Sequence, residues 1–128
     1  MYVTFLLLHS WHEFLPRGSD FNYDFKFVDV CIDMAKKYPH VYLSLSAMFM
    51  QDPDGTLRYP GGAEIVRKMK EAGVTHKVFW ASDASGKQGQ IKPVLISAIR
   101  AMVDAGWTEE ERTWALQGCS KKVFNMPL

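Results

Sequence analysis

The sequence predicts an α/β fold made of three parallel strand–helix units followed by a final helix. Three short apolar segments, 2–8, 41–46 and 78–80, are rich in β-branched and aromatic residues, as buried strands are. Each is followed by a stretch with apolar residues at helical spacing. The strands begin roughly 35–40 residues apart, a separation typical of right-handed parallel crossover units. The 128 residues leave room for one domain, 1–128, with a modest core.

The first strand and helix are predicted from their apolar patterns. Residues 2–8 form a continuous apolar run, which indicates a strand covered on both faces. A helix is expected over 20–37, where two lysines lie in the last turn and Pro39 stops it. Its apolar positions are Phe21, Phe25, Val28, Ile32 and Ala35.

The later helices are predicted from their boundary signals. The turn signal at 52–55 precedes a helix that begins at Pro60 and is closed by Gly73. The last helix opens with a capping box at Thr108 and is expected to run to Gly118, with the glutamates at 109–111 serving only its start and dipole. Between them, a helix over about 90–104 is expected to bury Ile91, Val94, Leu95, Ala98, Ile99 and Met102.

Charge and cysteine usage narrow the class of protein. The formal net charge of +1 is too small to indicate binding to nucleic acid or to an anionic membrane. Cys31 and Cys119 are isolated and form no metal or redox motif, which favours a reducing, cytoplasmic location. The apolar segment 2–8 lacks a basic leader region and is too short to span a bilayer, so a strand is expected there.

The functional groups are expected at the C-terminal ends of the strands. The strand 78–80 is followed by small residues and then by Asp83, which places a carboxylate in the loop before the next helix. Parallel α/β folds keep their chemistry at this position. The segment 81–88 also has some features of a phosphate-binding loop, but Ala81 and Gln88 replace its first glycine and its last hydroxyl residue. Weak phosphate capture by Lys87 at the helix N-terminus stays an alternative.

Four phrases, in this order, resemble the C-terminal part of proteins of the amidohydrolase-related family (amidohydrolase 2 type), which includes small-acid decarboxylases. A strand ends in histidine and an aromatic loop at 6–11, and YPHVYLSLS at 38–46 is similar to the family's YPNVYLDLS. HKVFWASD at 76–83 is similar to DKVLFGSD, and the segment 107–124 is similar to the closing LSDEERERILGGNAARLF. The resemblance covers nearly the whole chain.

The resemblance implies a partial TIM-type (β/α) barrel, with the three strands as barrel strands six to eight. It also implies a divalent metal, zinc or else manganese, at the C-terminal face, with His9 and Asp83 as ligands. Asp83 would be the catalytic residue that handles the proton of the activated water. Candidate substrate contacts lie in the loop after the first strand. They are His12, Trp11 and Arg17, of which the last suits a substrate carboxylate.

The activity implied is metal-dependent hydrolysis of a small carboxylate-bearing or cyclic substrate, with non-oxidative decarboxylation as the alternative. The family's His-x-His pair of barrel strand one and its strand-five histidine have no counterpart in this sequence. His9 and Asp83 are fewer than the three protein ligands that a catalytic zinc normally has. An inactive fragment that serves as a structural or assembly module is therefore a further hypothesis.

The sheet edges and the amino ends of the strands complete the predictions. Three parallel strands leave two open edges, so we expect a homo-oligomer or a complementary N-terminal barrel chain to cover them. His40 and His76 precede strands, at the end that stabilises such folds, and no function is expected for them.

Overall fold

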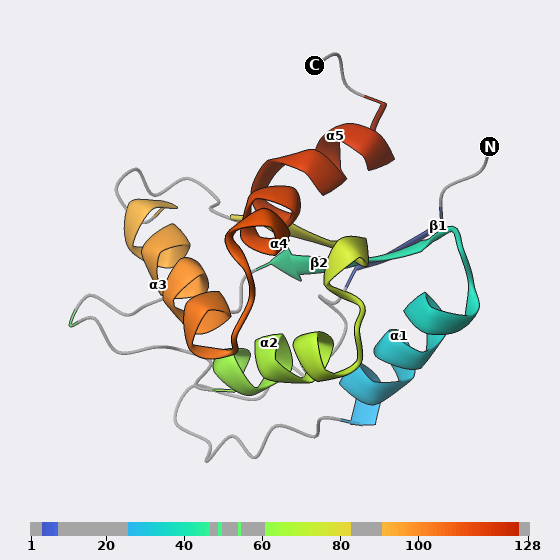
Figure 1. Cartoon of the computed structure of the whole chain (residues 1–128), viewed down its shortest axis with the longest axis horizontal. Coiled ribbons are helices and arrows are strands. Elements are labelled where there is room, and N and C mark those ends of the chain that lie inside the picture. The colour runs from blue at the N-terminus through green and yellow to red at the C-terminus, as the bar shows by residue number, and fades with distance from the viewer. Residues whose placement is uncertain are drawn as a thin grey trace.

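The computed structural model describes residues 4–7, 26–46, 49, 54, 61–82 and 91–125. Within these ranges, three parallel strands form one sheet in the order β1-β2-β3. They are β1 (Thr4–Leu7), β2 (Val41–Ser46) and β3 (Val78–Ala81). Leu7 pairs with Ser44 and Ser46 pairs with Ala81, so all three carboxyl ends lie at one edge of the sheet (Figure 1).

Two of the helices connect the strands and the others follow the sheet. Helix α1 (Lys26–Lys37) lies between β1 and β2, and α2 (Gly62–Glu71) and the 3₁₀ turn η2 (Thr75–Lys77) lie between β2 and β3. Helix α3 (Ile91–Asp104) follows. The C-terminal helical segment consists of α4 (Glu109–Thr113), the π turn η3 (Trp114–Gly118) and α5 (Cys119–Val123). No helix in the described ranges is long and apolar enough to cross a membrane.

The main core lies between one face of the sheet and helices α1, α2 and α3. Parallel strands in chain order with crossovers of one hand place their connecting helices on the same face. The indole Nε1–H of the buried Trp107 donates to the carbonyl of Val66 at 3.0 Å, which fixes the chain after α3 against α2. Its buried residues are Val28, Ile32, Ala35, Val41, Leu43, Leu45, Phe49, Ile65, Val66, Met69, Val74, Val78, Val94, Ala98, Ala101, Met102, Trp107 and Ala115.

The C-terminal helical segment covers the other face of β3. Phe79, Cys119 and Val123 form a second, smaller cluster, against which Tyr42 and Trp114 pack. In Figure 1 this segment lies above the sheet and α1 and α2 lie below it. The alternation of side chains along each strand produces the two clusters, because Val78 joins the main core and Phe79 the smaller one.

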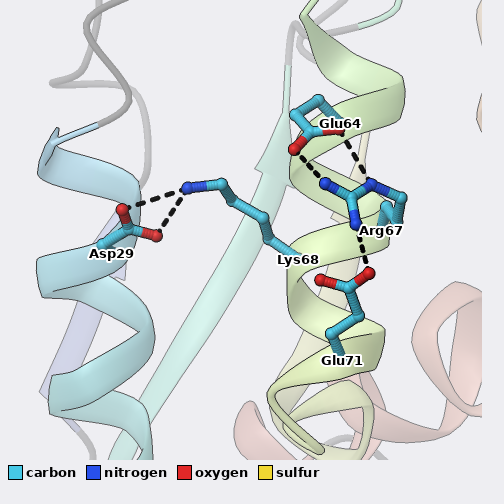
Figure 2. A network of polar contacts seen from close by, with 5 residues as sticks. All are labelled: Asp29, Glu64, Arg67, Lys68 and Glu71. Carbon is cyan, nitrogen blue, oxygen red and sulfur yellow. Dashed lines mark hydrogen bonds and ion pairs between the residues drawn. The ribbon is translucent and has the colours of Figure 1, made fainter.

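Charged side chains link the outer surfaces of the helices (Figure 2). Lys68 of α2 donates to both carboxylate oxygens of Asp29 on α1, at 2.8 and 3.0 Å. Along α2, Arg67 bridges Glu64 and Glu71, which lie one turn before and one turn after it. Such exposed pairs add little to stability.

The described strands and helices lie where the sequence predicts them, with two corrections in side-chain placement. Residues 20–25 of the predicted first helix and Pro60 are outside the described residues. Ile91, predicted to be buried, is 49% exposed, because it is the first residue of α3 and extends past the core. Leu95 and Ile99 are half-buried rather than buried.

The prediction that the last helix ends at Gly118 is wrong. Gly118 has helical dihedral angles (φ −67°, ψ −44°), and the helical segment continues to Val123. A Cβ atom at this glycine would lie 2.4 Å from the indole ring of Trp114. The residue is therefore small because the ring packs over its backbone, not because it terminates the helix.

We expect Gly118→Ala to lower the free energy of unfolding by about 1–3 kcal/mol, since the added methyl group displaces a packed ring. Trp114 cannot move freely, because its Nε1–H donates to the carbonyl of His76 at 2.7 Å. Urea denaturation measures the change. The neighbouring exposed variant Gln117→Ala is the control and should stay within about 0.5 kcal/mol of the parent. A Gly118→Ala variant at least as stable as the parent would contradict this packing.

Candidate functional site

The carboxyl edge of the sheet is where the sequence places its site. β1 and β3 flank β2, so their ends are separated by two strand spacings, about 10 Å. His9 follows Leu7 by two residues and Asp83 follows Ala81 by two residues. The predicted site residues, His9, Trp11, His12, Arg17 and Asp83, all lie outside the described residues. The structure thus brings together the strand ends that precede them.

Ser44 is a buried polar residue close to this edge that the sequence did not single out. It lies on β2 between Leu7 and Phe79 and is 1% exposed. Its Oγ has no hydrogen-bond partner in the described part of the chain. Buried hydroxyl groups are nearly always paired, so Ser44 is an unusual position within the described ranges.

The residue types near this edge suit a divalent metal only in part. Imidazole and carboxylate groups, as His9 and Asp83 supply, are ordinary zinc ligands. A catalytic zinc site normally has three protein ligands. Among the residues that the structure describes, no three His, Cys, Asp or Glu side chains gather in a group that could hold a metal ion. A complete site would therefore need a further ligand.

Two hollows lie at the opposite, amino edge of the sheet. The larger, of about 830 Å³, is formed by η2 and the C-terminal helical segment. Its walls include Thr75, His76, Trp114 and the glutamates at 109–111. The smaller, of about 500 Å³, lies between the end of α1, the start of β2, η2 and α5. His76 lines both, although no role was expected for it.

Glu111 joins three elements beside the larger hollow. Its carboxylate accepts hydrogen bonds from Lys70 Nζ at 2.7 Å, from Thr75 Oγ1 at 2.8 Å and from the backbone N–H of Thr108 at 2.8 Å. The last bond belongs to the predicted capping box, which is present. The expectation that the glutamates serve only the helix start is wrong for Glu111, because it also holds α2 and η2 against α4.

The pKa of Glu111 reflects these contacts. Partial burial by itself would raise the pKa, but hydrogen bonds from Lys70, Thr108 and Thr75 together lower it to about 2. The carboxylate therefore stays ionised over the whole physiological range. Its geometry and charge suit a structural junction rather than an acid that exchanges protons near neutral pH.

Lys77, which lines the smaller hollow, is buried and has no carboxylate partner among the described residues. Lys77 is 7% exposed, and its Nζ donates to the carbonyls of Ala35 at 2.8 Å and Tyr38 at 2.6 Å, at the end of α1. It also lies over the ring of Tyr42, 5.4 Å from the centroid. Burial, and to a lesser extent the charge of Lys122, lower the pKa of Lys77.

The two cysteines are free thiols in apolar surroundings. Burial raises the pKa of Cys31, and it raises that of Cys119 to about 11 although Lys122 acts in the opposite direction. Both thiols are protonated at neutral pH, so neither is prepared to act as a nucleophile.

Comparisons with known proteins give no match: no family model, no curated protein and no solved structure is significantly similar to this chain.

We expect Glu111→Gln to destabilise the protein by about 2 kcal/mol at pH 7, since it weakens bonds from Lys70 and Thr75 to a charged acceptor. A carboxyl group whose pKa is lowered on folding stabilises above its ordinary pKa and loses that effect as pH falls towards its folded pKa. The difference between variant and parent should therefore shrink between about pH 4.5 and about pH 2. Denaturant titrations at several pH values measure it.

Glu110→Gln is the matched control, because Glu110 is exposed in the same helical turn. It should change the free energy of unfolding by less than about 0.5 kcal/mol at every pH. If both variants lost the same free energy of unfolding at every pH, the role of Glu111 as a structural junction would be contradicted.

Proposed function

We propose that this chain is the C-terminal part of a metal-dependent hydrolase of the amidohydrolase-related type, acting on a small carboxylate-bearing or cyclic substrate. The observation that supports the proposal is the parallel pairing of β1 and β3 on either side of β2. Both of these strands end at the same edge of the sheet, and His9 and Asp83 each follow a strand end by two residues in the sequence. In a barrel these strands would be numbers six to eight, where neighbours in sequence are also neighbours in space.

Each site residue has a distinct role in this proposal. A bound zinc or manganese ion would lower the pKa of its bound water to near neutrality. His9 and Asp83 hold the ion, and Asp83 also accepts the proton of the attacking water. Arg17 pairs with the substrate carboxylate, and His12 and Trp11 contact the rest of the substrate. In the alternative, non-oxidative decarboxylation, Asp83 assists transfer of a proton to the substrate.

The proposal requires a further protein ligand and a cover for the open sheet edges. A second copy of the chain or a complementary N-terminal barrel chain would supply both. The second candidate is an inactive barrel fragment that serves as an assembly module. The sequence feature that favours it is the missing counterpart of the family's His-x-His pair and strand-five histidine. For either candidate we propose the cytoplasm as the location, because the two cysteines are isolated and free.

The metal content of the purified protein tests the proposal. We expect near-stoichiometric zinc or manganese in the parent, because the imidazole of His9 and the carboxylate of Asp83 together provide ligands for it. The metal should be lost in His9→Ala and in Asp83→Ala. Elemental analysis after gentle purification measures it, and light scattering at micromolar concentration tests whether the metal-loaded form is an oligomer.

His40→Ala is the control, since His40 is an exposed histidine at the amino edge of the sheet. It should keep the metal. Metal at background level in all four proteins would overturn the hydrolase proposal and leave the assembly module as the remaining candidate. A strictly monomeric parent would count against completion of the site by a second copy.

A further inference from the structure

The smaller hollow gathers positive charge from three separate parts of the chain. Lys36 comes from the last turn of α1, Lys77 comes from η2, and Lys122 comes from α5. Among the residues that the structure describes, no acidic side chain lines it. The hollow thus differs from the larger one beside it, whose walls carry three glutamates.

The three lysines have no carboxylate partners in the described ranges, where the ion pairs of lysine and arginine involve Arg67, Lys68 and Lys70. Lys77 is close enough to Lys122 for the two charges to act on each other. Like charges that meet in a partly enclosed space repel more strongly than in water. A fold that brings them together without a counter-charge is stabilised when an anion enters.

The donors left in the hollow suit an anion with several oxygens. An ammonium group has three N–H donors. Lys77 uses two of them on the carbonyls of Ala35 and Tyr38, which holds the group in place and leaves the third. Lys36 and Lys122 are exposed, and each adds an ammonium group to the lining. Charge-assisted bonds of this kind are among the stronger polar contacts in proteins.

The remaining wall is apolar, and the volume is larger than an inorganic ion needs. Tyr42, Pro39 and Ala72 line it beside the lysines. A volume of about 500 Å³ falls in the range of sites for small organic ligands. The hollow therefore offers one charged end and one apolar surface.

We propose that this hollow, at the amino edge of the sheet, binds a small organic phosphate, with Lys36, Lys77 and Lys122 around the phosphate group and Tyr42 against the organic part. The site is distinct from the proposed metal site, which lies at the carboxyl edge. It does not depend on the hydrolase proposal.

Phenyl phosphate is a suitable probe, because it combines a dianionic group with an aromatic ring. Calorimetric titration of the full chain at fixed ionic strength should give saturable binding with a Kd below about 10 mM. Lys36→Gln and Lys122→Gln should each weaken binding about fivefold to tenfold, because each removes one charged donor. Both residues are exposed, so the variants should fold, and circular dichroism verifies this.

Lys37→Gln and Lys121→Gln are the matched controls. Each removes one positive charge from a residue next to a proposed contact but outside the lining of this hollow. Their affinity should stay within twofold of the parent. Equal weakening in all four variants would show attraction to general surface charge and overturn the site. Failure of the parent to bind the probe below about 10 mM would overturn it as well.

Discussion

The structure depends on parallel pairing along both edges of β2. A parallel neighbour requires a crossover connection, and crossovers of one hand place α1 and α2 on the same face of the sheet. That face then holds the main core. On the other face, the C-terminal helical segment packs against Phe79 and Tyr42. The position of the main core thus follows from this one pairing.

Charge is distributed unevenly over the amino edge of the sheet. Glu111 collects donors from three elements and fixes α2 and η2 to the start of α4. Lys77 fixes the end of α1 to the start of β3 through two carbonyls. Each charged group therefore joins segments that are far apart in the sequence. The carboxyl edge is left free of such structural links among the described residues.

Local signals in the sequence predict most of the fold. Runs of β-branched and aromatic residues predict β2 and β3. The three-residue spacing between Thr108 and Glu111 predicts the capping box. The parts that could not be predicted depend on distant partners. The bond from Lys77 to Ala35 spans 42 residues, and that from Trp114 to His76 spans 38. The carboxyl-edge site stays a prediction, drawn from the strand order and from the family resemblance, whereas Ser44 and the basic hollow have no local signature.

The π turn at Trp114–Gly118 has a consequence for how this segment tolerates changes in length. A π turn uses one residue more than an α turn, so everything after it is rotated by about 100° relative to an unbroken α-helix. That rotation directs Cys119 and Val123 towards Phe79. Loss of a single residue here would remove this extra residue and close an ordinary α turn, which leaves Cys119 and Val123 facing the sheet. Insertion of one residue would instead turn these two side chains away from the sheet and carry Lys122 out of the hollow.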